Sequence, residues 1–164
     1  MNWFKKTNKN KVIKRIKDIL KNHPFTRKLM DDYNVSHNEI DDNLIIEIKD
    51  LYGRFAEGNG KKIVLDSKII NKNFFKENFH FVIHEFFHWI RRRVEKDFYF
   101  EDPEEIQSFI LAVTWELLNN KQEEEIRTKI FPIIVKHFEN ESKAKEFFNR
   151  IFLRALKLYE QQKG

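Results

Sequence analysis

Residues 80–90, which read HFVIHEFFHWI, constrain the fold more than any other part of the chain. Their apolar side chains recur with the period of an α-helix, and such a helix has to bury one face against another element. His84 and His88 project from the opposite side, about one turn apart, with Glu85 next to them. The apolar face consists of Val82, Ile83, Phe86, Phe87, Trp89 and Ile90. We therefore expect a helix over 77–95 that packs into a core and presents two histidines on its polar face.

The rest of the chain favours further helices. Only 4 glycines and 3 prolines interrupt 164 residues, too few for the turns of an all-β protein, and 17 phenylalanines can supply a core. Asp102 is expected to cap a helix that begins at Pro103. Asn120 with Glu123 resembles a capping box for the next helix, which Pro132 should kink or break. The predicted helices span 9–22, 25–34, 103–118, 121–138 and 141–161.

Residues 43–66 change to a strand pattern. Short apolar or alternating runs follow one another there, and Gly58, Asn59 and Gly60 can provide the positive φ angles of a tight hairpin. We expect a small antiparallel sheet packed beside the histidine-bearing helix. The predicted fold class is α+β and mostly helical. The predicted organisation is a single domain over 1–164, with a basic helical extension at 1–40, a core at 43–118 and a C-terminal helical pair at 121–164.

The histidine-bearing helix has the spacing of a metal site. The chain contains no cysteine, so any metal ligand has to be His, Asp or Glu. Two histidines four apart on one helix face can reach one ion at ~2.0–2.1 Å, and the HExxH pattern adds a carboxylate that can act as a base. The pattern predicts Zn²⁺ ligands at His84 and His88 and a general base at Glu85. The alternative is a buried helix that spells this motif by chance.

A third ligand has to come from elsewhere, and the acidic cluster at residues 101–105 is the nearest supply. Glu105 is followed at helical spacing by Ser108 and Ala112, small residues that allow a close approach of two helices. Glu104 is followed by larger residues. Glu105 could instead close a capping box at the start of its helix. Glu105 is the first candidate, and the others are Glu104, Asp102, Glu101, Glu116 or none.

The remaining histidines differ from this pair. His80 lies about 12 Å along the helix axis from His88, too far to share its ion, so we expect a polar wall of the cleft or a surface side chain. His80 and Tyr99 are candidate contacts for the substrate or for an oxyanion. Structural or surface roles are expected for His23, His37 and His137, with His137 a remote candidate for an extra ligand.

Positive charge gathers at the N-terminus, where residues 1–28 carry ten basic side chains and one acidic one, Asp18. Apolar residues alternate with these cations at helical spacing, which favours a surface helix docked on the core over nucleic-acid or membrane-surface binding. The first residues lack the apolar run of a signal peptide, and no stretch is long and apolar enough for a transmembrane helix. We expect a cytoplasmic protein.

The order of these features resembles the zincin metallopeptidases. A strand (KKIVLD), an approach segment (NFHFVI), HEFFH and a further helix (EEIQSFILAVTWEL) are similar in order to the compact domains of the ImmA/IrrE type and of small phage-associated peptidases. In this gluzincin-like arrangement the third ligand is a glutamate that opens the next helix and precedes a small residue by three positions. Glu105 and Ser108 have that spacing.

The resemblance implies a zinc-dependent metallopeptidase. His84, His88 and Glu105 would hold Zn²⁺, and Glu85 would take a proton from the metal-bound water and pass it to the leaving amine. A peptide or protein substrate would lie extended along the edge of the strand KKIVLD. The alternative is a non-catalytic zincin-like protein with a structural or lost metal site, whose basic N-terminal arm binds nucleic acid or another protein.

Overall fold

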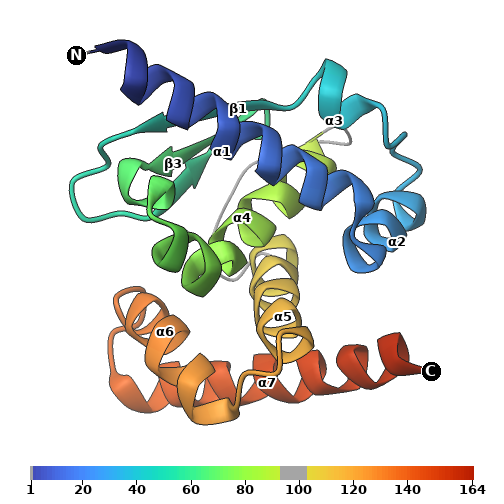
Figure 1. Cartoon of the computed structure of the whole chain (residues 1–164). Helices are drawn as coiled ribbons and strands as arrows, with labels where there is room; N and C mark the ends of the chain where they lie inside the picture. Colours follow the sequence, from blue (N-terminus) through green and yellow to red (C-terminus); the bar gives the residue numbers. More distant parts are fainter. Residues whose placement is uncertain (1, 93–102) are drawn as a thin grey trace. The chain divides into compact units, whose positions relative to one another are not determined.

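The computed structural model describes residues 2–92 and 103–164. The chain divides into two compact units, Met1–Lys96 and Asp97–Gly164. The described residues form seven α-helices, one 3₁₀ helix and one three-stranded sheet, which Figure 1 colours along the sequence. This arrangement confirms the predicted α+β, mostly helical fold. The predicted organisation as a single domain stays a prediction.

The first unit contains the sheet and four of the helices. Its helices are α1 (Asn2–Asn22), α2 (Pro24–Asp32), α3 (Glu39–Asp42) and α4 (Lys72–Arg92), with a 3₁₀ helix, η1 (Ser67–Ile70), before the last. Its strands are β1 (Ile45–Lys49), β2 (Ala56–Gly58) and β3 (Lys62–Asp66).

The sheet is mixed and has the strand order β1-β3-β2. β2 and β3 form the predicted hairpin: the Asn59 side chain accepts from the N–H groups of Lys61 and Lys62 at 3.1 Å, and Gly60 takes the positive φ of 72°. β1 pairs with the other edge of β3 and runs parallel to it, so the prediction of a wholly antiparallel sheet was wrong at this pair. Residues 50–55 carry the chain past β3 before the hairpin begins, and β1 and β3 therefore run in the same direction.

Helix α1 lies along the sheet of this unit in Figure 1, and some of its cations bind groups of the same unit. Lys9 donates to the Ile48 carbonyl of β1 at 2.8 Å, and Lys21 forms an ion pair with Asp41. The fully buried residues of its apolar face are Ile16 and Leu20. These contacts confirm the prediction of a docked surface helix. Nucleic-acid binding by this basic segment stays a prediction.

Helix α4 forms the centre of the first unit. Asn78 has non-helical angles, with φ −127°, which divides the helix one residue after position 77, where it was predicted to begin. The turn before this kink is capped by Asn71, whose side chain accepts from the N–H of Asn73 at 2.9 Å. After the kink, the predicted apolar face is almost fully enclosed, with exposures of 2% or less at Val82, Ile83, Phe86, Phe87, Trp89 and Ile90. The period of the apolar residues therefore predicted the buried face correctly.

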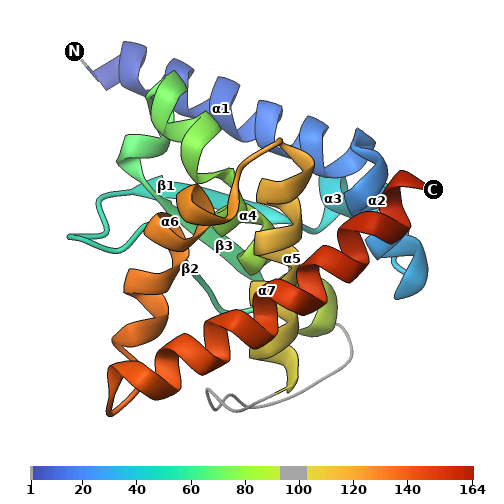
Figure 2. The same cartoon turned by 90° about the horizontal axis from the view of Figure 1, so that it is seen from below.

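The second unit is a three-helix arrangement of α5 (Pro103–Leu118), α6 (Glu123–Val135) and α7 (Glu141–Lys163). Helix α7 packs against both α5 and α6, as Figure 2 shows. Asn140 caps α7 by accepting from the N–H of Lys143 at 2.9 Å. The core consists chiefly of Phe109, Ile110, Val113, Leu117, Ile126, Ile130, Ile134, Phe147, Phe148, Ile151 and Phe152.

Two predictions at the helix ends need correction. Asn120 does not cap α6; it has a φ of 61° and its N–H donates to the Leu117 carbonyl at 3.0 Å, which ends α5. The capping box of α6 lies two residues later, where the Glu125 carboxylate accepts from the N–H of Gln122. Pro132 does not break α6, which continues through it to Val135, although its ring leaves the helix without one backbone donor.

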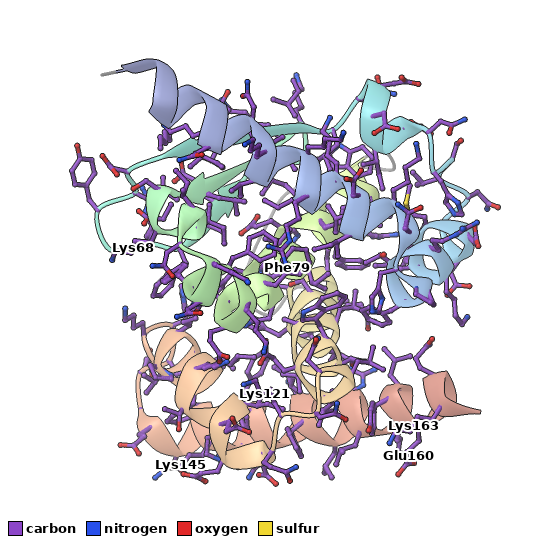
Figure 3. The ribbon with its side chains drawn as sticks, viewed as in Figure 1. Lys68, Phe79, Lys121, Lys145, Glu160 and Lys163 are labelled. Carbon is purple, nitrogen blue, oxygen red and sulfur yellow. The ribbon has the colours of Figure 1, made fainter. Side chains whose placement is uncertain are left out.

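Polar and apolar side chains are distributed within each unit as the sequence pattern requires. Figure 3 labels Phe79, which is 3% exposed, inside the first unit, whereas Lys145, Glu160 and Lys163 of α7 are exposed. No helix in the described ranges has a stretch long and apolar enough to cross a membrane.

Candidate metal centre

His84 and His88 face each other on α4. Their Nε2 atoms are 3.2 Å apart, and the two rings meet at an interplanar angle of 70°. Two nitrogens bound to a tetrahedral zinc ion at ~2.0–2.1 Å are separated by about 3.3 Å, the edge of the tetrahedron. The pair therefore needs no rearrangement of the helix to share one ion.

The packing of α4 fixes the direction in which the histidines point. Phe87 meets the ring of Tyr33, the residue that follows α2, edge-on, with ring centroids 5.6 Å apart, and Phe86 stacks on Trp89 at the same separation. The contact of Phe87 with Tyr33 joins α4 to a neighbouring segment, and the enclosed apolar face of α4 leaves His84 and His88 on its other side. His88 is buried, with 6% of its surface exposed, whereas His84 is only partly buried. One imidazole is thus anchored in the protein, and the other lies nearer to solvent.

Glu85 lies beside the histidine pair and close to β2. Its Oε2 atom occupies the space where a side chain on Gly58 would begin. Within the described ranges, neither a hydrogen bond nor an ion pair engages the Glu85 carboxylate.

Glu105 belongs to the second unit, in the first turn of α5. Among the described residues, His84, His88 and Glu105 are a group whose donor types could hold a metal ion, since each offers one ligand atom. The neighbouring Ser108 is fully buried and donates to the Glu105 carbonyl at 2.7 Å. The histidine pair lies within the first unit alone, and the role of Glu105 as third ligand stays a prediction.

The other carboxylates that were candidates for the third ligand have different surroundings from Glu105 or lie outside the described residues. Glu116 is buried and lies 3.4 Å from the Lys129 ammonium, an ion pair within the second unit. Glu104 is buried at 7% exposure and is not part of the candidate group. Glu101, Asp102 and the predicted contact Tyr99 lie outside the described residues.

His80 is buried, with 1% of its surface exposed, and its ring centroid lies 4.2 Å from that of Phe81. The alternative of a surface side chain was wrong, because the packing around α4 encloses His80, two residues after the kink at Asn78. A contact of His80 with substrate stays a prediction.

His23 and His37 have structural roles, as predicted. The Nδ1 atom of His23 accepts from the N–H of Phe25 at 3.2 Å and caps α2, and burial lowers the pKa of this imidazole. His37 lies 2.8 Å from Asp31 on the surface.

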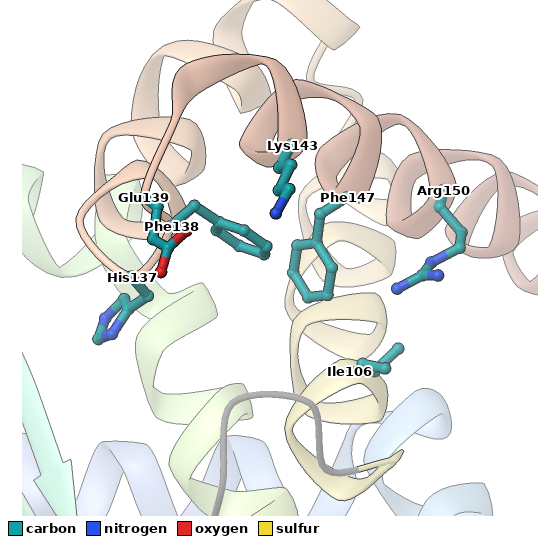
Figure 4. Close-up of a pocket in the computed structure, with 7 residues that line it drawn as sticks. All are labelled: Ile106, His137, Phe138, Glu139, Lys143, Phe147 and Arg150. Carbon is teal, nitrogen blue, oxygen red and sulfur yellow. The ribbon is translucent and has the colours of Figure 1, made fainter.

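His137 lines a hollow of about 570 Å³ on the second unit, at the end of α6 (Figure 4). The hollow is lined by Ile106, His137, Phe138, Glu139, Lys143, Phe147 and Arg150. Its charged side chains are exposed, and His137 is not part of the candidate metal group in the described ranges. The expectation of a surface histidine is confirmed.

Sequence reasoning missed the part that Gly58 plays beside Glu85. Gly58 was assigned only to the hairpin, yet the positive φ angle of that turn is at Gly60. The available signal was that the hairpin needs one glycine, Gly60, and the sequence has a second one, Gly58, beside it. Glycine also allows another group to approach the backbone closely.

Comparisons with protein-family models, with curated proteins and with solved structures find no match to this chain.

Proposed function

We propose that this protein is a zinc-dependent peptidase in which His84, His88 and Glu105 bind the metal and Glu85 is the general base. The observation that carries this proposal is the 3.2 Å separation of the two histidine Nε2 atoms, beside the Glu85 carboxylate, which has no hydrogen bond or ion pair to any of the described residues. Two imidazoles and one carboxylate are also a donor set of catalytic zinc sites, which keep a fourth position open. The absence of cysteine excludes the thiolate ligands that many structural zinc sites use.

Each residue then has a separate task. When bound, Zn²⁺ would supply a Lewis acid that lowers the pKa of water to about 7 and polarises a carbonyl group. His88, which is buried, fixes the ligand pair, and the partly buried His84 completes it on the side nearer to solvent. Glu85 accepts the proton of the attacking water and delivers it to the leaving amine.

The sheet suggests how an extended peptide is held. β3 is the central strand, with β1 on one edge and β2 on the other, so the predicted strand addition along KKIVLD was wrong. β2 has one edge paired with β3 and lies beside Glu85. We assign the peptide to the other edge of β2, where backbone hydrogen bonds would bind substrate with little dependence on its sequence.

The first test is the metal content of the purified native chain, measured by plasma mass spectrometry without added metal. We expect about one zinc ion per chain, and its loss in His84→Ala. Glu105→Gln should weaken zinc binding, whereas Glu104→Gln, a change of the same kind one residue earlier, should not. Loss of zinc in Glu104→Gln alone would remove Glu105 from the ligand set.

The second test separates metal binding from turnover. Glu85→Gln keeps the shape of the side chain and removes the base, so it should retain zinc and lose peptide hydrolysis by about 10²–10⁴-fold. The assay is cleavage of a mixed peptide library by the zinc-loaded chain. Undiminished cleavage by Glu85→Gln would refute the role of Glu85, and no cleavage by the native zinc-loaded chain would refute the peptidase proposal.

A further inference from the structure

Gly58, the last residue of β2, is packed against the side chain of Glu85. A Cβ atom added at Gly58 would lie 3.4 Å from the Glu85 Cδ atom and 3.5 Å from the Lys62 carbonyl oxygen, and it would overlap the Glu85 Oε2 atom. The Lys62 oxygen is at an ordinary contact distance. The Glu85 carboxylate is therefore the group that a side chain at position 58 would displace.

The backbone of Gly58 does not require glycine. Positive φ angles among the described glycines occur at Gly53 and Gly60, so Gly58 has a conformation that other residues can adopt. Gly58 also pairs with Ile63 in the regular register of β2 and β3. Glycine in a strand weakens it, since it has no side chain to pack and the most freedom to lose. Among these contacts, the only reason for glycine at position 58 is that the Glu85 side chain occupies the space of a Cβ atom.

We propose that Gly58 is a positioning residue for Glu85: its missing side chain lets the carboxylate lie against the backbone of β2, beside the histidine pair. This inference rests on the proposed function, in which Glu85 is the general base. The carboxylate is confined on one side by β2 and is attached on the other to α4, which is fixed by its buried apolar face. Gly58 acts only through Glu85 and is not itself a catalytic residue.

Gly58→Ala should keep the fold while moving the base. The overlapping atom is the far end of a flexible side chain, so Glu85 can turn aside by about 1 Å to restore an ordinary contact. A misplacement of this size can cost about 10²-fold in rate. We expect Gly58→Ala to bind zinc as the native chain does, and to lose about 10²-fold in kcat with KM little changed.

The contact itself is tested without any activity, by thermal unfolding of the metal-free chain. Four proteins are compared: the native chain, Gly58→Ala, Glu85→Ala and the double variant. Alanine at position 58 reduces the freedom of the unfolded chain, which raises Tm, but in the native background this gain is offset by the overlap with Glu85. Gly58→Ala should therefore raise Tm more in the Glu85→Ala background than in the native one. Equal changes in the two backgrounds would overturn the inference.

The positioning role is tested by a shorter carboxylate. Glu85→Asp withdraws the charged group by one methylene, which removes its overlap with alanine at position 58. Each single variant should lose activity, but the double variant Gly58→Ala with Glu85→Asp should be no less active than Gly58→Ala alone. Losses that multiply would show two independent defects and would overturn the positioning role. If the native chain proves inactive, the peptidase proposal fails. The Tm comparison still decides whether the Glu85 carboxylate lies against the backbone of Gly58.

Discussion

Zinc should raise the melting temperature of the native chain, and His88→Ala should abolish this rise. The two Nε2 atoms are already 3.2 Å apart, so binding does not have to reorganise α4 and most of the binding free energy should appear as added stability. At a free zinc concentration 100 times Kd, the added stability is about 2.7 kcal/mol. For a chain of 164 residues, this corresponds to an increase in Tm of roughly 5–10 °C.

The assay is thermal unfolding followed by circular dichroism, with and without zinc, and each variant is compared with its own metal-free form. His88→Ala removes a buried side chain and lowers the metal-free Tm, but the change produced by zinc should disappear. His37→Ala is the matched control, because His37 is a surface histidine that contacts Asp31. The reasoning is refuted if zinc stabilises His88→Ala as much as the native chain, or if it leaves the native Tm unchanged.

Three further predictions concern stability. Burial lowers the pKa of His23 below 6.5, so the unfolded chain takes up a proton first as pH falls; the stability from the neutral imidazole is complete above pH 6.5 and is lost as pH falls toward the folded pKa. His23→Asn keeps an oxygen that can cap α2 but does not titrate. The free energy of unfolding, measured by urea titration at pH 7.5 and at about pH 5.5, should therefore change less in this variant than in the native chain; an equal change would contradict the role of His23. Phe148→Ala should cost about 3–5 kcal/mol in urea unfolding, against less than about 0.5 for the exposed Leu153→Ala; similar losses would show that Phe148 is not enclosed. Asn120→Gly should keep the stability because glycine accepts the φ of 61°, whereas Asn120→Val should lower Tm, and the opposite order would refute the left-handed end of α5.

Local patterns in the sequence correctly predicted the helices and the hairpin, which depend on interactions between residues close together in the chain. The helix that bears His84 and His88 follows from an apolar period of 3.6 residues, and the position of the pair on one face follows from the same period. The hairpin at Asn59 and Gly60 is also local, since one side chain and one positive φ angle close it. Where two local signals competed, the prediction failed: Asn120 has the chemistry of both a helix start and a helix end, and α5 uses it as an end.

The sequence by itself therefore determined the helix, the two imidazoles on one face and the carboxylate between them, because i and i+4 neighbours on a helix have to meet. Only the tertiary structure decided that β1 runs parallel to β3, that His80 is buried and that Glu85 lies against Gly58. These features depend on residues far apart in the chain, whose encounter is decided by how the strands pair and how α4 packs. Helix periodicity fixes the direction in which each side chain leaves its own helix. The residues that this side chain then contacts are set by the packing of all the helices and strands together.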